Sequence, residues 1–105
     1  MNLNVRFKGF DGSDGVRDYL KERTTKLVKF LPPTTVVNAT LEDDRVRKIV
    51  EINLRHKGTD YIARQESENL LNSIDDAVDK LVRQLSRAKE RKTSRSPNPS
   101  KEIVE

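Results

Sequence analysis

Apolar and polar residues alternate in four short stretches of the chain. The alternation covers residues 3–8, 36–42, 47–55 and, less regularly, 60–66. Successive side chains of a β-strand point to opposite faces, so this alternation predicts strands with one buried and one solvated face. The apolar faces of the first three consist of Leu3, Val5, Phe7, Val37, Ala39, Leu41, Val50, Ile52 and Leu54, and the last stretch places Tyr61 and Ala63 opposite Ile62.

Two further stretches have apolar residues at the period of an α-helix. The first spans about 14–30, where Ser13 is a suitable N-cap and Pro32, the first of two prolines, ends the helix. The second begins after Ser67, which can cap it, and runs to about Arg91. The apolar stripes consist of Val16, Leu20, Leu27 and Leu31, flanked by Tyr19 and Phe30, in the first helix and of Leu70, Leu71, Ile74, Ala77, Val78, Leu81, Leu85 and Ala88 in the second.

The order of these elements is β-α-β-β-β-α. A right-handed crossover through the first helix leaves the first two strands parallel, and the short later connections make the other pairs antiparallel. Because both helices have to bury an apolar stripe, we predict an α+β fold, a two-layer sandwich of a four-stranded mixed sheet with both helices on one face. Residues 1–92 form this domain, and residues 93–105 (TSRSPNPSKEIVE) have no hydrophobic period and predict a disordered tail.

The composition of the 105 residues excludes several classes of protein. The chain has no cysteine and a single histidine, His56, which rules out a disulfide scaffold, a multi-histidine metal cluster and a cysteine nucleophile. No apolar run approaches the length of a membrane span and the N-terminus has no signal-peptide pattern, so we expect a cytoplasmic protein. No nucleophile–base pair is evident around His56, and we therefore predict a protein that is not an enzyme and has no cofactor.

Three other features resemble sites but have simpler explanations. His56 lies in a predicted turn and is best explained as a solvated residue, with a backbone or RNA contact as the alternative. The carboxylates of Asp75, Asp76 and Asp79 do not share one helix face, and they complement the helix dipole better than they would hold a metal. Residues 9–15 resemble a phosphate-binding loop but lack its Gly-Lys-Ser/Thr ending, so a turn and a helix cap are expected there.

The net charge of +4 is modest, but the charges of the second helix are unevenly distributed. Residues 66–79 contain five acids and no base, whereas residues 80–92 contain six bases and one acid. This order complements the helix macrodipole, which explains part of the pattern. It does not explain why four bases of the second half fall on one narrow stripe, directed away from the apolar stripe. These four are Lys80, Arg83, Arg87 and Arg91.

The first helix has its own line of bases, formed by Arg23, Lys26 and Lys29. If both helices lie side by side on the sheet, the two lines can merge into one basic surface, which suits the phosphates of a nucleic acid. Most of the five aromatic residues occupy core positions, so structured RNA fits better than a single strand, which needs stacking platforms. The basic surface has two alternative explanations. It could be a charged face that only solvates the helices, or part of a module that binds acidic membranes. The membrane module would need the apolar stripes that the core uses.

The segment 73–85, SIDDAVDKLVRQL, closely resembles the last helix of the ribosome hibernation promoting factor family, also called ribosome-associated inhibitor A or sigma-54 modulation protein. The resemblance spans about residues 1–92 and implies the family's β-α-β-β-β-α fold, which is related to double-stranded-RNA-binding domains, in its short form. The chain departs from the family at 69–71, where Asn-Leu-Leu stands in place of an acid and an aromatic residue. The first helix is similar to the family at Arg17, Tyr19, Arg23, Lys26, Leu27 and Lys29.

The resemblance implies a translation inhibitor that binds the small ribosomal subunit and the whole ribosome under stress or in stationary phase. Such a protein would block the path of mRNA and tRNA. It would need neither a small-molecule substrate nor a membrane, and it would be a monomer when free. The resemblance is compatible both with silenced single ribosomes and with ribosome pairs. A regulator of another structured RNA or of a sigma factor is the alternative function. The residues implied in rRNA binding are Arg23, Lys26, Lys29, Lys80, Arg83 and Arg87, extended by Arg17, Lys21, Arg91 and Lys92.

Overall fold

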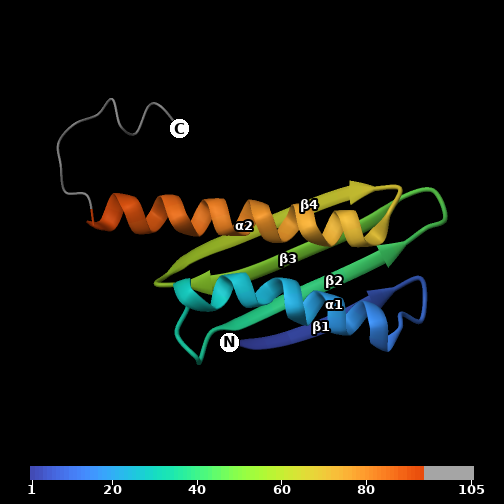
Figure 1. Cartoon of the computed structure of the whole chain (residues 1–105), viewed down its shortest axis with the longest axis horizontal. Helices are drawn as coiled ribbons and strands as arrows, with labels where there is room; N and C mark the ends of the chain where they lie inside the picture. Colours follow the sequence, from blue (N-terminus) through green and yellow to red (C-terminus); the bar gives the residue numbers. More distant parts are fainter. Residues whose placement is uncertain (94–105) are drawn as a thin grey trace.

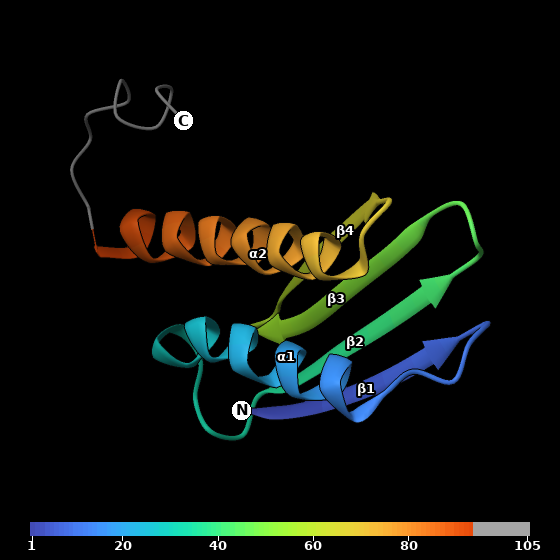
Figure 2. The same ribbon diagram turned by 45° about the vertical axis from the view of Figure 1, so that its right-hand side comes forward.

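The computed structural model describes residues 1–93, with side chains up to residue 89, and it has the predicted order of elements (Figures 1 and 2). A short 3₁₀ helix, η1, is the one addition to that order within the described residues. The bounds are β1 Asn2–Lys8, α1 Asp14–Thr24, η1 Thr25–Phe30, β2 Val36–Asp43, β3 Lys48–His56, β4 Thr59–Ser67 and α2 Leu70–Thr93.

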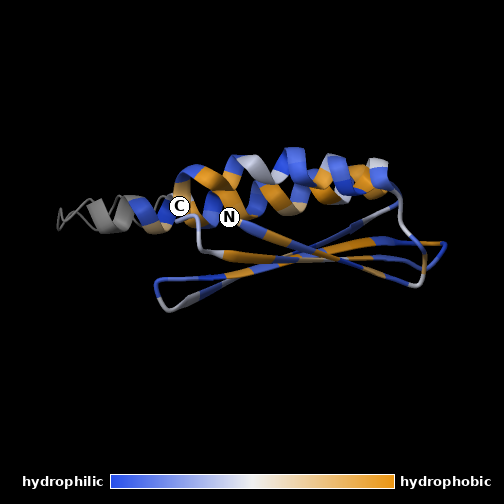
Figure 3. Ribbon diagram, turned by 90° about the horizontal axis from the view of Figure 1, so that it is seen from below, coloured by the Kyte–Doolittle hydropathy of each residue, from blue (hydrophilic) through white to orange (hydrophobic). Residues whose placement is uncertain are grey.

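The four strands form one mixed sheet in the order β1-β2-β3-β4. The pair β1–β2 is parallel and the other two pairs are antiparallel, as the crossover argument predicts. The register aligns Val5, Ala39, Ile52 and Ala63 in one row across the sheet. Both helices lie on the face to which this row points (Figure 3), and the predicted two-layer α+β fold is therefore confirmed.

The core lies between the sheet and the two helices. Leu20 and Leu27 from α1 and η1, and Ile74, Val78 and Leu81 from α2, are fully buried. The sheet contributes the alternating residues that the sequence assigns to its apolar faces, and β1 contributes only partly buried ones because it is an edge strand. The fully or nearly fully buried sheet residues are Val37, Ala39, Leu41, Val50, Ile52, Leu54 and Ala63.

The helix predicted over 14–30 is not a continuous α-helix, because it tightens to 3₁₀ geometry after Thr24. Two adjacent threonines mark the change. The Thr24 hydroxyl donates to the backbone carbonyls of Leu20 and Lys21, and the Thr25 hydroxyl donates to that of Glu22. Such back-bonding competes with the helical ladder at its acceptors and favours a change of geometry.

The predicted cap of the second helix is wrong by two residues. The side-chain oxygen of Asn69, not that of Ser67, accepts the backbone N–H groups of Leu71 and Asn72 at 2.9 and 3.2 Å. Ser67 instead supports the cap, since its hydroxyl accepts the N–H of Asn69 and bonds to the buried hydroxyl of Ser73. Asparagine is among the best capping residues, so the departure from the family pattern at this position still begins the helix well.

The far end of α2 is Thr93, close to the predicted end at about Arg91. Residues 94–105, nearly all of the predicted tail, lie outside the described residues. Among the helices described, none combines the length and the apolar character that crossing a membrane requires.

Candidate nucleic-acid interface

The two helical segments lie side by side on the sheet (Figure 1). Most of the predicted RNA-binding residues on these segments are exposed. Arg23 is half-buried and differs from the others in this respect. Arg91 and Lys92 belong to α2, but their side chains lie outside the described ones. The exposed members of the set are Arg17, Lys21, Lys26, Lys29, Lys80, Arg83 and Arg87.

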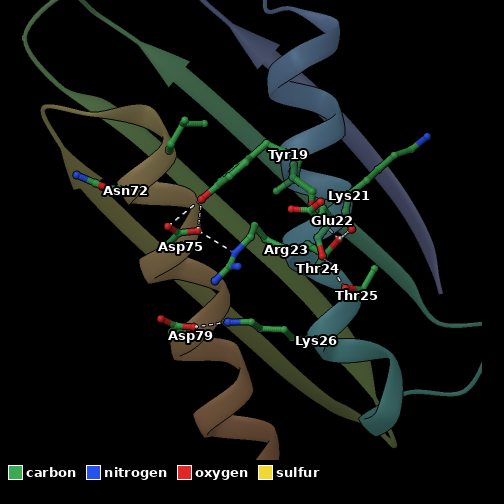
Figure 4. Close-up of polar contacts among 12 residues, drawn as sticks. Tyr19, Lys21, Glu22, Arg23, Thr24, Thr25, Lys26, Asn72, Asp75 and Asp79 are labelled. Carbon is green, nitrogen blue, oxygen red and sulfur yellow. Dashed lines mark hydrogen bonds and ion pairs between the residues drawn. The ribbon is translucent and has the colours of Figure 1, made fainter.

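Asp75 of α2 is bound by two residues of α1 (Figure 4). The hydroxyl of Tyr19 donates to both of its carboxylate oxygens, at 2.8 and 2.9 Å. The Nε atom of Arg23 lies 2.9 Å from Oδ1 of Asp75 without forming a directed hydrogen bond, so the contact is an ion pair. The hydrogen bond to Asp75 raises the pKa of the Tyr19 hydroxyl above its usual value, because the carboxylate favours the protonated phenol.

A second bridge joins the helices about one turn farther along. Nζ of Lys26 lies 3.6 Å from Oδ1 of Asp79, and both side chains are nearly half exposed (Figure 4). The acids therefore do more than complement the helix dipole, because Asp75 and Asp79 also contact the first helical segment. They also lie between the two lines of bases, so these lines do not merge into the uninterrupted basic surface that side-by-side helices could form.

The outer side of α2 keeps a basic stripe, Lys80, Arg83 and Arg87, which we call the α2 stripe. Lys80 and Arg83 are exposed and form no ion pair with the residues that the structure describes, and Arg87 continues the line one turn later. The neighbours Leu81 and Leu85 are buried, so the apolar and basic stripes point in different directions, as predicted.

The 3₁₀ geometry of η1 aligns two further bases. A 3₁₀ helix has three residues per turn, so side chains at i and i+3 lie directly above one another. Lys26 and Lys29 have this spacing, and both are exposed. Lys29 also lies over the ring of Phe30, with its Nζ atom 5.3 Å from the ring centre. Lys29 is thus an exposed base of the first helical segment that forms no ion pair with the residues the structure describes.

Sequence reasoning missed the contact between the helices, although a signal for it exists. Tyr19 and Arg23 are four residues apart on one helix, and Asp75 and Asp79 are four residues apart on the other. Equal spacing places each pair on one face of its helix, so two complementary faces could have been matched. The partners are 56 residues apart for Tyr19 and Asp75, and no local pattern indicates which faces meet.

Known proteins resemble the chain over almost all of the described residues. Residues 3–93 match the family model described as "Sigma 54 modulation protein / S30EA ribosomal protein". The chain is 30% identical over 95 residues to the ribosome hibernation promoting factor of Azotobacter vinelandii, a match that covers 90% of this chain and 89% of the relative. It is 29% identical over 91 residues to the factor of the same name from Klebsiella oxytoca, covering 87% and 96% of the two chains.

Two solved structures share the fold. A ribosomal subunit interface protein from Coxiella burnetii aligns with a TM-score of 0.73 at 22% identity, over 85% of this chain and 98% of the other. The N-terminal domain of Protein Y from Thermus thermophilus aligns with a TM-score of 0.76 at 24% identity, over 83% and 98%. These likenesses confirm the arrangement of the sheet and the two helices.

Proposed function

Because the chain belongs to the Sigma 54 modulation protein / S30EA ribosomal protein family, we propose that it is a ribosome hibernation factor that binds the small ribosomal subunit. In this proposal the outer surface of the two helices contacts rRNA and the bound domain blocks the path of mRNA and tRNA under stress or in stationary phase. The action is steric, so the protein works by binding and not by catalysing a reaction, and ribosome binding makes it cytoplasmic.

The observation that carries the proposal is the α2 stripe. Three exposed bases follow one another along a helix whose opposite face is fixed in the core, so their positions are set by the fold. Bases in a line along a rigid support can contact consecutive phosphates of an RNA chain, which releases counterions and makes binding depend strongly on salt. Recognition through phosphates and shape is the usual way in which proteins bind structured RNA.

The other predicted residues contribute to the proposed interface to different extents. Lys29, Lys21 and Arg17 are exposed and extend the surface across the first helical segment, and Arg91 and Lys92 continue the sequence of α2. Arg23 and Lys26 remain in the interface, but their positive charge is shared with Asp75 and Asp79, so each contributes less to an RNA contact than Lys80 or Arg83.

Sedimentation with purified ribosomes and separated subunits tests the proposal. We expect the protein to migrate with the small subunit and the whole ribosome, and the double change Lys80→Glu with Arg83→Glu to abolish this without altering the circular dichroism. The matched control is Arg6→Glu with Lys8→Glu, which reverses two exposed charges of β1. Absence of binding at moderate salt, with binding to a sigma factor or to another structured RNA, would support the alternative function and overturn this one.

A further inference from the structure

The turn between β3 and β4 carries a second group of bases. Arg55, His56 and Lys57 are consecutive in the sequence, and we call them the hairpin tip. Lys57 and Gly58 both have positive φ, 54° and 79°, as in the tight two-residue turns that join antiparallel strands. The tip is therefore a tight turn at the end of the paired strands β3 and β4, and Arg55 and Lys57 are exposed there.

The hairpin tip lies at the same end of the molecule as η1 and the C-terminal half of α2 (Figures 1 and 2). The hairpin tip, the end of η1 and the start of β2 line one groove. The lining includes Phe30, Pro32 and Val36 on the side of the first helical segment, and Arg55, His56 and Lys57 on the other.

Phe30 links this groove to the basic surface of the helices. Its ring centre lies 5.3 Å from Nζ of Lys29 and 6.0 Å from Nζ of Lys89, which comes from α2. Bases of η1 and α2 thus lie near the Phe30 ring, and the bases of the hairpin tip line the same groove as this ring. Exposed bases therefore lie both on the helical segments and at the adjoining end of the sheet.

The fold itself does not require bases at the tip. A two-residue turn with positive φ favours Asn-Gly or Asp-Gly, and here lysine occupies the first position. Arg55 pairs with Asp60 at 3.1 Å, but the two side chains are 67% and 64% exposed. Pairs this exposed contribute little to stability, and a phosphate can compete for the arginine.

We propose that the hairpin tip is a second RNA-contacting element, in which Arg55 and Lys57 bind phosphates of an rRNA segment that passes over the groove beside Phe30. This inference rests on the proposed function, since the RNA in question is the one that the helices contact. The occupant is identified by charge complementarity and by the continuity of the tip with the basic helical surface. The RNA is thereby held from two sides of the domain.

The first test compares three variants of the full chain in their binding to small subunits over a range of salt concentrations. Arg55→Gln with Lys57→Asn removes two charges, and asparagine keeps the positive φ of the turn. We expect binding to weaken about 5- to 30-fold and the salt slope to fall by roughly two. Asp60→Asn removes the competing carboxylate and should strengthen binding, which damage to the fold could not imitate.

The control is Arg6→Gln with Lys8→Gln, which removes the same charge from the exposed face of β1. If wild-type protein binds and the hairpin variant binds equally well, or no worse than the control, the inference is overturned and the proposed function stands. If wild-type protein does not bind the small subunit, the proposed function itself fails.

The second test identifies what the tip contacts. The chain has no cysteine, so Thr59→Cys introduces a single exposed thiol beside the tip for a photo-crosslinker, and Lys8→Cys provides a distant control. We expect the label at position 59 to react with rRNA. A crosslink from position 59 to ribosomal proteins alone would show that the tip contacts protein and would overturn the inference.

Discussion

The hydroxyl of Tyr19 donates to both carboxylate oxygens of Asp75, at 2.8 and 2.9 Å, and so connects α1 to α2. Arg23 reaches the same carboxylate from the next turn of α1. One acid of α2 thereby contacts two residues of the first helix, and both helices also contribute to the buried core, for example Leu20 and Val78. This contact connects the helix that carries the α2 stripe to the first helical segment, which carries Lys26 and Lys29.

We predict that Tyr19→Phe lowers the urea midpoint of unfolding without changing the fold. The substitution removes one hydroxyl and leaves Asp75 with its ion pair to Arg23. Phenylalanine keeps the ring in the partly buried position of the tyrosine, so a loss of stability reports the hydrogen bond and not a cavity. Equilibrium unfolding followed by circular dichroism measures it, and an unchanged midpoint would show that the contact does not stabilise the helix pair.

The same hydrogen bond predicts a dependence of stability on alkaline pH. Asp75 raises the pKa of the Tyr19 hydroxyl in the folded state above its unfolded value of about 10. The stability that this hydrogen bond contributes is therefore fully present below the unfolded pKa. It is lost as the pH rises through the higher folded pKa. A spectrophotometric titration of phenolate, compared between wild type and Tyr19→Phe, should give a difference curve with a midpoint above 10. A midpoint at or below 10 would contradict the contact.

A second pH dependence is expected at the turn between β2 and β3. A hydrogen bond from Lys48 and one from the backbone N–H of Arg45 lower the pKa of Asp43. Backbone N–H groups of Arg47 and Val46 likewise lower the pKa of Asp44. Both carboxylates stabilise the fold above their unfolded pKa, and this contribution is lost as the pH falls through their lower folded values.

The thermal midpoint should consequently fall in acid more steeply for wild type than for the double variant Asp43→Asn with Asp44→Asn. Both proteins are measured between about pH 6 and about pH 2, a range that includes the usual titration of aspartate. Parallel curves for the two proteins would refute the assignment of these carboxylates to the acid sensitivity.

The burial of side chains in the core predicts that two leucines of α2 contribute very differently to the free energy of unfolding. Leu81 is fully buried and Leu71 is 40% exposed. Leu81→Ala should cost about 2–5 kcal/mol of unfolding free energy, because it removes buried methyl groups and leaves a cavity. Leu71→Ala should cost well under half of that, because part of its side chain is already in water. Equal losses in denaturant unfolding would show that α2 is rotated from its assigned orientation.

Local patterns were sufficient to predict the sheet and the core, whereas contacts between distant side chains were not predictable. The alternation of single residues assigned Val37, Ile52 and Leu54 to the buried face, because one strand face has one environment along its whole length. The cap at Asn69 was missed because Ser67, two residues earlier, has an equally suitable side chain, and the choice depends on where β4 ends. The local sequence relates Asp75 only to the helix dipole, because its partners lie on another helix.

The pairing of Lys26 with Asp79 predicts a variant that binds RNA more tightly than wild type. The two charged groups are 3.6 Å apart and nearly half exposed, so Asp79 reduces the charge that Lys26 presents without being needed for the core. Asp79→Asn should strengthen binding to the small subunit about 2- to 5-fold, the effect of one weak surface ion pair, and should increase the salt dependence. Asp76→Asn is the matched control, since it removes an exposed acid of the same helix that, within the described part of the chain, forms no bridge to η1. Equal gains from both changes would mean that only the net charge matters. Weaker binding by Asp79→Asn would mean instead that the bridge positions Lys26 for the phosphate. A filter-binding titration at two salt concentrations distinguishes these outcomes.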